Sequence, residues 1–599
     1  MILLFGGTTE GRKAVEVLEE AGTPYYYSTK TGEQAVALHY GQRVDGAMDA
    51  DMMQHFCSQH GIRLLVDAAH PFAAGLHQTV IMVAGRLSIP VVRYERIYPP
   101  RSADILWIDD YSQIPRDIHT LLATTGVQSI RKLRPLEAYG MTIYYRILKR
   151  QSSIRLAHEQ GVPDSRICYY EDADSMNLHA DAVLLKESGL SGGFVEKVDA
   201  ARARGMRIIA IKRPESMAHD AVVDGPYGLR RAVERLLPAF FPLHSGLTTG
   251  TCATAAAVAA MLQLRGKRPS EVPVLLPDGE TLQVAVGYGG GHAYCIKEAG
   301  DDPDVTQGLE IRATVCQTSA PADHIVSAPV EGERVIIAGG EGVGRFTLPG
   351  FDYPPGEPAI NKVPREMIRR NLDMLIGDAD SRQADGSKQW ICTISVPHGA
   401  EVARRTFNPR LGIEGGISIL GVSGIVKPFS EEAFVGSIRK CMQVAKASGS
   451  QRVVLNSGAK SEGFLRQAYP DLPPQAFVQY GNYIGETLRM ADSLHFPRVT
   501  LGVMLGKAVK LAEGQLDTHS RKSVMNRDFV AGLLDEAHCA TDLSSVTLAR
   551  ELWEKIPAER LDDFCRAVIG HCLKHCRSLV PRSSLTILLI ADDGTIHSL

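Results

Sequence analysis

The sequence lacks the features of a membrane, nucleic-acid-binding or secreted protein. No apolar run in its 599 residues approaches the roughly 20 residues that span a bilayer. Basic and acidic residues nearly balance, at a formal net charge of −3, so we expect neither nucleic acid nor a membrane surface as partner. The 11 cysteines are scattered singly and odd in number, which predicts reduced thiols and a cytoplasmic protein.

A basic leader is also missing at the N-terminus. The opening residues, MILLFGGTTEG, already have the pattern of a strand and a helix, so we expect no signal peptide. The composition, 44% hydrophobic and 22% charged, is that of a globular protein. At about 100–200 residues per domain, the length predicts about three to five structural units.

The first 240 residues alternate short apolar runs with helical patterns. A helix is expected over residues 9–22 and a closing helix over 226–240. Strands are expected at 2–7, 24–29, 63–69, 90–95, 181–188 and 206–214. This alternation predicts an α/β fold with parallel sheets.

The turn GGTTEG after the first strand is a candidate phosphate loop. Glycines allow close approach of a ligand, and the helix start offers free N–H groups to an anion. The candidate cofactor-binding residues are Gly6, Gly7, Thr8, Thr9 and Gly11. An ordinary tight turn, with Thr8 capping the helix, stays open as the alternative.

The second strand ends in Ser28-Thr29-Lys30, without the acid that usually holds the adenine ribose of NADH. Thr29 and Lys30 would suit a 2′-phosphate, which favours NADPH over NADH. A solvated strand end explains the same residues equally well.

Three further segments end strands with polar residues. DAAHPFA carries His70, which could contact a ligand, donate a proton or be purely structural. KESGLSGG carries Lys186 and Ser188 and leads into a helix bearing Lys197, a second candidate anion site. IKRP adds Arg213.

Together these motifs resemble the cobalt-precorrin-6A (precorrin-6x) reductases over residues 1–240. The resemblance implies two Rossmann-like halves and a reduced nicotinamide that saturates one double bond of a corrin precursor. It makes His70 a candidate proton donor, and Arg146, Lys186, Lys197 and Arg213 candidate clamps for substrate carboxylates. The family usually has Thr before the histidine, where this chain has Ala69.

A second domain start follows an expected linker at residues 241–246. Hydroxyls of Thr248, Thr249 and Thr251 stand at a helix start beside free N–H groups, which suits a carboxylate or a sulfonium amino acid; helix capping is the alternative. Cys252 is expected to be a packing residue rather than a nucleophile.

Several later loops predict a small-molecule site. Carboxylates at Asp301, Asp302 and Asp304 could bind a substrate, a cofactor or a metal. Glycines interrupt an apolar run at 406–428, which predicts strand, turn and strand, with Gly412, Gly415, Gly416 and Ser418 contacting a cofactor or forming a packed hairpin. VVLNSG, YGNYIG and GKAVKLAEGQLDTHS are junctions between elements and loops.

These strings resemble the cobalt-precorrin-5B C1-methyltransferases, over a domain expected at 247–525. The resemblance implies an α+β fold of non-standard type and methyl transfer from S-adenosylmethionine to C1 of the macrocycle. A carboxylate such as Asp301, Asp302 or Asp304 could take part in binding or deprotonation, with Asp301 and Asp302 as the candidate catalytic residues. Residues 526–599 are expected to be a C-terminal extension of unknown role, with helices and a final strand. HCLKHC at 571–576 could be a zinc half-site, but an ordinary helix is favoured and no metal site is predicted.

The two resemblances predict a bifunctional enzyme that methylates a cobalt-corrin precursor and then reduces the product. Two alternatives stay open: a non-catalytic regulator that binds nucleotides and tetrapyrroles, and a generic NAD(P)-dependent dehydrogenase fused to an unrelated domain. Association with further copies of the chain is also left open.

Overall fold

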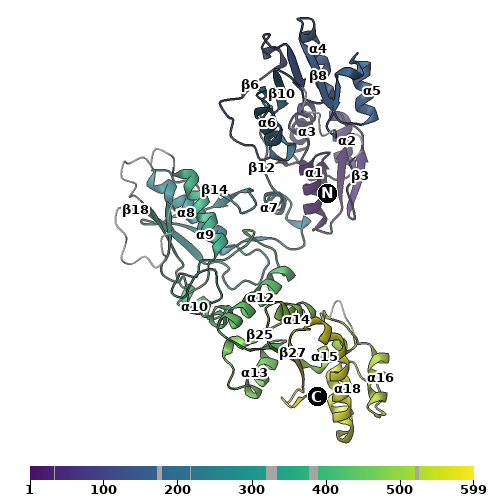
Figure 1. Ribbon diagram of the computed structural model, residues 1–599, viewed down its shortest axis with the longest axis vertical. Helices are drawn as coiled ribbons and strands as arrows, with labels where there is room; N and C mark the ends of the chain where they lie inside the picture. The colour runs from purple at the N-terminus through teal and green to yellow at the C-terminus, as the bar shows by residue number, and fades with distance from the viewer. Residues whose placement is uncertain are drawn as a thin grey trace. The chain divides into compact units, whose positions relative to one another are not determined.

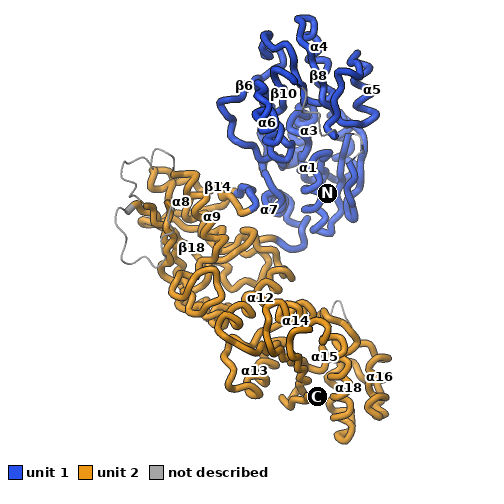
Figure 2. The backbone as a smooth tube through the Cα atoms, viewed as in Figure 1, with its two compact units in different colours: residues 1–244, 278–282 blue, residues 245–277, 283–599 orange. Residues whose placement is uncertain are grey.

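The computed structural model describes residues 1–30, 32, 34–171, 179–215, 217–318, 334–376, 389–519 and 525–599. The chain divides into two compact units, residues 1–244 with 278–282 and residues 245–277 with 283–599 (Figure 2). Within the described ranges, no helix is both long and apolar enough to cross a membrane.

The first sheet of unit 1 is parallel, with the strand order β12-β5-β4-β1-β2-β3. Successive side chains of β1 enter two different cores, Ile2 and Leu4 on one face and Leu3 and Phe5 on the other, which is why the strand is a continuous apolar run. The elements are β1 (Ile2–Phe5), β2 (Tyr25–Thr29), β3 (Gly41–Asp45), β4 (Leu64–Asp67), β5 (Val91–Tyr94) and β12 (Ala221–Val223), with α1 (Thr9–Glu19), α2 (Ala50–Gln59), α3 (Ala74–Leu87) and α7 (Pro226–Leu236).

A second parallel sheet has the order β6-β11-β10-β7-β8-β9. The predicted parallel α/β fold is confirmed, and all six predicted strands are present. Among the described residues of this unit, the sequence pattern missed six other strands, including the polar edge strand β3. The elements are β6 (Leu106–Ile108), β7 (Thr120–Ala123), β8 (Thr142–Ile147), β9 (Ile167–Tyr169), β10 (Ala182–Lys186) and β11 (Arg207–Ile211), with α4 (Ile130–Glu137), α5 (Gln151–Glu159) and α6 (Phe194–Arg202).

Unit 2 begins with a buried helix, α8 (Thr249–Leu264), which packs against α9 (Lys362–Leu375) and across β17 and β18 (Figure 1). Its small side chains allow this close approach on several faces. The sheet beneath has the order β16-β17-β18-β21-β19. The elements here are β13 (Gly246–Leu247), β14 (Glu271–Leu275), β15 (Thr281–Ala285), β16 (Gly287–Tyr288), β17 (Ala293–Ile296), β18 (Glu310–Thr318), β19 (Val335–Gly339), β20 (Arg345–Phe346), β21 (Gln389–Ser395), β22 (Ile413–Glu414), β23 (Ile425–Val426), α10 (Gly399–Ala403) and α11 (Asn408–Leu411).

The rest of unit 2 is a sheet of order β25-β24-β26-β27-β28, parallel from β25 to β27. Residues 526–599 are not an appended extension: β27 pairs with β26 along its whole length, and α18 packs on α15. This part is α/β, unlike the α+β expectation. The elements are β24 (Arg452–Asn456), β25 (Phe477–Gln479), β26 (Arg498–Met504), β27 (Ser584–Ile590) and β28 (Ile596–His597), with α12 (Glu431–Ala447), α13 (Ala459–Ala468), α14 (Ile484–Ser493), α15 (Leu505–Ala512), α16 (Arg527–Glu536), α17 (Leu552–Lys555) and α18 (Ala558–Cys576).

Candidate functional site

The first sheet has a topological switch point between β1 and β4. From β1 the chain adds β2 and β3 on one side, and it then continues with β4 and β5 on the other. In open parallel sheets, ligands bind beyond the carboxyl ends of the strands at such a point. The loops that meet here are the predicted motifs GGTTEG and DAAHPFA.

The GGTTEG loop divides into packing positions and an open position. A Cβ on Gly6 would enter the ring of Tyr27, and one on Gly11 would lie 2.8 Å from Cα of Gly6, so close packing requires both glycines. Gly7 has φ +90° and open space around it, and its N–H donates to Oε1 of Gln34 at 3.0 Å. This N–H also contacts the hydroxyl of Tyr27 at 3.2 Å, so an incoming ligand could take the amide of Gly7 from two side chains.

The two threonines of the loop differ in their contacts. Thr8 caps α1: its hydroxyl accepts from the N–H of Gly11 at 2.9 Å and donates to the carbonyl of Ala68 at 2.7 Å. The capping alternative thus describes Thr8. The hydroxyl of Thr9 accepts from Arg12 at 3.5 Å.

The end of β2 has an acid that the sequence pattern did not show. The hydroxyl of Thr29 donates to a carboxylate oxygen of Asp45, the last residue of the neighbouring strand β3, at 2.8 Å. Lys30 beside it is exposed. The position that usually selects between NADH and NADPH therefore carries both an acid and a lysine.

A buried ionic network fixes the DAAHPFA loop. Oδ2 of Asp67 lies 2.5 Å from Nδ1 of His77, and Oδ1 accepts from Arg93 at 3.0 Å. Burial alone would raise the pKa of Asp67, but the His77 hydrogen bond and the Arg93 charge lower it. Arg93 also donates to the carbonyl of Ala69, and Nε2 of His77 to that of His70. The network therefore sets the position of His70.

His70 is held in its neutral form. Burial, with the charges of Arg96 and Lys186 nearby, lowers the pKa of His70 to about 4. Its Nδ1 accepts from the N–H of Phe72 at 3.2 Å, which leaves the proton on Nε2. A neutral imidazole of this kind donates a hydrogen bond but is a weak proton donor in catalysis.

Three of the predicted clamps gather at the corresponding edge of the second sheet, whose switch point lies between β7 and β10. The Lys197 ammonium lies 5.5 Å and the Arg146 guanidinium 4.5 Å from the ring centre of Tyr170, and Lys186 lies 5.1 Å from that of Phe72. Burial lowers the pKa of all three, that of Lys197 to about 8. Such partly dehydrated cations suit a ligand with several carboxylates.

The other two predicted substrate-binding residues of unit 1 also have internal partners, as Lys197 has in the carbonyl of Gly192 at 3.0 Å. Arg213 pairs with Glu187 at 3.2 Å and stacks on Tyr98 at 3.6 Å, beside an open recess that Glu95 and Arg101 also line. The hydroxyl of Ser188 donates to the carbonyl of Gly192 at 3.2 Å.

One bridge across unit 1 was not foreseen. The guanidinium of Arg96 donates to Glu10 in α1 at 2.9 Å and to the carbonyl of Ser188 after β10 at 2.7 Å, and Ser191 also donates to Glu10. Burial would raise the pKa of Glu10, but Ser191 and Arg96 lower it. These contacts bring the carboxyl edges of the two sheets together around His70 and Lys186.

In unit 2, the threonines at the start of α8 are bound to the protein itself. Thr248 caps the helix by accepting from the N–H of Thr251 at 3.1 Å. Thr249 accepts from the N–H of Leu420 at 2.8 Å, and Thr251 donates to the carbonyl of Gly424 at 2.6 Å. Cys252 is fully buried, as expected of a packing residue.

The glycine-rich segment 412–424 does not form a hairpin of its own. Its two short strands pair elsewhere, β22 with β20 and β23 with β13. A Cβ on Gly412 would lie 2.5 Å from Cδ1 of Leu348, and one on Gly416 would lie 2.7 Å from the N of Gly344. Ser418 donates to Oδ1 of Asn408 at 3.2 Å. Only Gly415 of the four has open space around it.

The acidic loop after β17 is partly structural. Asp304 lies 3.1 Å from the buried ammonium of Lys297, and Asp302 accepts from the N–H of Phe429 at 3.0 Å, while Asp301 is exposed. Among the described residues, no group of three or more His, Cys, Asp and Glu side chains could hold a metal.

The HCLKHC segment belongs to a helix with a buried face and a more exposed face. Its two cysteines are buried, while His571 contacts Glu536.

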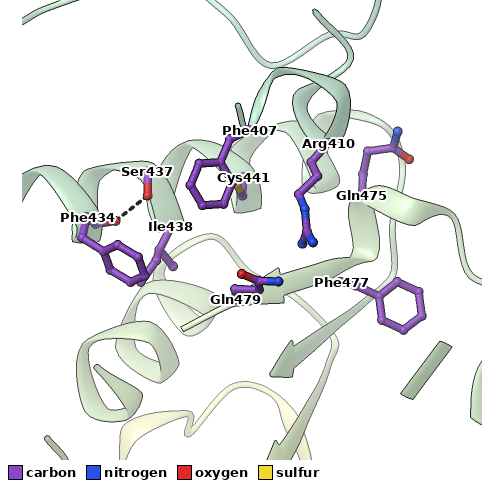
Figure 3. Close-up of a pocket in the computed structure, with 9 residues that line it drawn as sticks. All are labelled: Phe407, Arg410, Phe434, Ser437, Ile438, Cys441, Gln475, Phe477 and Gln479. Atoms are coloured by element: carbon purple, nitrogen blue, oxygen red, sulfur yellow. Dashed lines mark hydrogen bonds between the residues drawn. The ribbon is translucent and has the colours of Figure 1, made fainter. Parts of the chain in front are cut away.

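A small pocket lies beside the edge strand β25, lined by nine residues from α11, α12 and β25 or next to them (Figure 3). Its polar side is closed: Arg410 lies 2.6 Å and Gln479 2.9 Å from the carboxylate of Glu462. These contacts occupy Arg410 and Gln479, so most of the lining left to a ligand is aromatic or aliphatic.

Two family models match the chain, "Precorrin-6x reductase CbiJ/CobK" over residues 1–226 and "CbiD" over residues 239–428. A cobalt-precorrin-5B C(1)-methyltransferase of Prosthecochloris aestuarii is 43% identical over 366 residues, which is 59% of this chain and 95% of the relative.

Two solved structures are also similar. The cobalamin biosynthesis protein cbiD from Archaeoglobus fulgidus is 30% identical (TM-score 0.25, 48% of this chain and 84% of that chain). A CobK precorrin-6A reductase is 18% identical (TM-score 0.33, 39% of this chain and 96% of that chain). Both TM-scores are low, so the family assignment depends on the family models and the sequence relative.

Proposed function

Because the chain belongs to the CbiD family of cobalt-precorrin-5B C(1)-methyltransferases and carries a precorrin-6x reductase portion before it, we propose that it performs two consecutive steps of cobalamin biosynthesis. Unit 2 methylates C1 of cobalt-precorrin-5B, and unit 1 reduces the resulting cobalt-precorrin-6A to cobalt-precorrin-6B. The match of both families within one chain carries this proposal. A covalent link fixes the two activities at equal amounts and raises the local concentration of the intermediate.

In the reductase unit, a nicotinamide cofactor supplies hydride when bound. The open amide of Gly7 and the start of α1 fit its pyrophosphate, provided that Gln34 moves aside. Lys186, Lys197 and Arg146 hold substrate carboxylates, and neutral His70 orients the substrate through its Nε2–H. The proton that follows the hydride then comes from water or from the substrate.

The choice between NADPH and NADH depends on the end of β2. Lys30 favours the 2′-phosphate of NADPH, whereas the Asp45 carboxylate beside Thr29 favours the free ribose hydroxyls of NADH. The carboxylate has a fixed hydrogen-bonded position and the lysine is exposed, so we propose NADH as the better donor, in place of the NADPH preference that the sequence favoured.

In the methyltransferase unit, S-adenosylmethionine supplies an electrophilic methyl group when bound. An electron-rich ring carbon needs no strong base to attack it, so the protein mainly orients the reactants and excludes water. Asp301 and Asp302 remain candidates for substrate binding or deprotonation.

Mass spectrometry of the pigment tests the proposal. The full chain is incubated with cobalt-precorrin-5B and S-adenosylmethionine, first alone and then with NADH or NADPH. We expect a gain of one methyl group, followed by a gain of two hydrogens. A non-catalytic regulator would bind the pigment and leave its mass unchanged, and a generic dehydrogenase would show no methylation.

A further inference from the structure

The third sheet has a switch point of its own, which none of the predicted cofactor residues occupies. From β24 the chain adds β25 on one side and then continues with β26 and β27 on the other, all four strands being parallel. The crevice rule for open parallel sheets therefore directs a ligand to the carboxyl ends of β24 and β26.

Three helices start at this edge without a side-chain cap. The N-cap residues of α13, α14 and α15 are Gly458, Tyr483 and Met504, and none of them accepts a hydrogen bond from its helix. In contrast, Ser430 caps α12 and Asn526 caps α16. At α14 the N–H of Gly485 already donates to the carbonyl of Leu516 at 3.1 Å, so α13 and α15 are the two starts whose first N–H groups are left to other acceptors.

A buried polar group at the same edge lacks a partner. Asn456, the last residue of β24, is fully buried, and its Nδ2 donates to the carbonyl of Val478 at 3.3 Å. Its Oδ1 accepts no hydrogen bond in the described part of the chain. Buried amide oxygens are normally paired, so this one points to a hydrogen-bond donor from a ligand.

A cation lies across the end of the same strand. Lys507, in the first turn of α15 after β26, donates to the carbonyl of Gly481 after β25. Because β24 lies between β25 and β26, this hydrogen bond joins the loops on either side of the strand that ends at Asn456. Burial, together with the charge on Lys510, lowers the pKa of Lys507 to about 8.

We propose that the amino-acid end of S-adenosylmethionine binds at this edge, with its ammonium on Oδ1 of Asn456 and its carboxylate on Lys507 and the uncapped helix starts. The inference deepens the proposed methyltransferase function and moves the cofactor away from Gly412, Gly415, Gly416 and Ser418. A zwitterion needs both an acceptor and a cationic donor, and this edge has Oδ1 of Asn456 and the ammonium of Lys507. A corrin carboxylate would use the donors but leave Oδ1 of Asn456 unpaired.

Calorimetry with two probes tests the site on the full chain. S-adenosylhomocysteine has the amino-acid end, whereas 5′-methylthioadenosine lacks it. The wild type should bind the first probe at least tenfold more tightly. Asn456→Leu and Lys507→Met should each remove most of this difference and leave the affinity for 5′-methylthioadenosine unchanged. A misfolded variant would instead lose both probes, so Lys507→Arg, which keeps a cation, serves as the second variant and should retain part of the preference.

Lys574→Ala, in the exposed face of α18, is the matched control and should bind like the wild type. The proposed site is wrong if the Asn456 and Lys507 variants still prefer S-adenosylhomocysteine over 5′-methylthioadenosine as the wild type does. It is also wrong if they raise KM for cobalt-precorrin-5B and leave the affinity for S-adenosylhomocysteine unchanged. Methylation by the wild type separates these results from failure of the proposed function: a wild type that neither binds the probes nor methylates the pigment overturns both.

Discussion

The guanidinium of Arg96 donates to the carboxylate of Glu10 at 2.9 Å, and both side chains are buried where the two sheets of unit 1 make contact. The same guanidinium reaches the carbonyl of Ser188, so one residue fixes the helix that starts at the dinucleotide loop and the loop that follows Lys186. The spacing between the proposed cofactor and substrate positions therefore depends on this pair.

We expect Arg96→Met to destabilise unit 1 by about 3–5 kcal/mol, because it leaves the Glu10 carboxylate buried without its partner. Heat inactivation of reduction, with methylation of the same sample as internal reference, measures the effect. Arg86→Met breaks the exposed pair with Asp51 and should cost only about 0–1 kcal/mol. Equal losses in the two variants would show that the bridge has no special role.

The low pKa of His70 predicts a pH profile. If a protonated His70 were the proton donor with an ordinary value of 6.5, reduction would slow as the pH rises through that value; with a pKa of about 4, we expect no such step. His70→Asn should raise KM for the pigment more than it lowers kcat. A step near pH 6.5 that His70→Asn abolishes would restore the donor role.

The same residue affects stability. Between pH 6.5 and about 4 the unfolded chain binds the additional proton, so the free energy of unfolding falls as the pH is lowered through this range. We expect His70→Gln to reduce this pH dependence. The measurement is urea unfolding of unit 1 at several pH values, with loss of reductase activity as the signal. An identical slope in the variant would contradict the assigned protonation state.

Lys197 should make substrate binding by the reductase sensitive to alkaline pH. Its pKa is lowered to about 8 by burial, so it loses its charge as the pH rises above that value, and KM for the carboxylate-rich pigment should increase. Lys197→Arg, which keeps its charge, should flatten the profile. Steady-state kinetics from neutral to alkaline pH provide the measurement, and an unchanged profile in Lys197→Arg would exclude this role.

Asp45→Asn should shift the coenzyme preference toward NADPH by about tenfold in kcat/KM, since it removes a negative charge beside Thr29, equivalent to about 1.4 kcal/mol. The ratio of the two kcat/KM values reports the shift directly. Lys30→Ala should change the ratio in the opposite direction. If Asp45→Asn leaves this ratio unchanged, the adenine ribose of the coenzyme does not bind beside Asp45.

Thr251→Val distinguishes a structural from a substrate-binding hydroxyl. The carbonyl of Gly424 still accepts from the N–H of Thr248 at 3.0 Å, so the variant loses one of its two hydrogen bonds, which should cost about 0.5–1.5 kcal/mol. We expect earlier heat inactivation of methylation with KM for cobalt-precorrin-5B unchanged. A raised KM at unchanged stability would favour the substrate contact that the sequence predicted.

The parallel fold of the first 240 residues could be predicted because its signals are local. Apolar runs covered on both faces, as in β1, alternate with amphipathic helices, and glycine turns follow the strands. The same local signals located the loops at both switch points, including His70 and Lys186.

The partners of these residues could not be predicted, since they depend on contacts distant in sequence. Glu10 and Arg96 are 86 residues apart, and Asp45 reaches Thr29 only because β3 pairs with β2. Threonine and glycine are also ambiguous by nature. Here the hydroxyl of Thr251 donates to a backbone carbonyl, and Gly416 lacks a side chain because neighbouring backbone lies too close for one. The same two residue types would also suit a ligand site.

The position of β27 in the third sheet has a consequence during protein synthesis. This strand lies between β26 and β28, so the sheet with the proposed methyl-donor site stays incomplete until the ribosome has added β28, which ends at His597. The two sheets of unit 1 have all their strands once Val223 has been made. In a growing polypeptide, the enzyme for the later reaction can therefore mature before the enzyme for the earlier one.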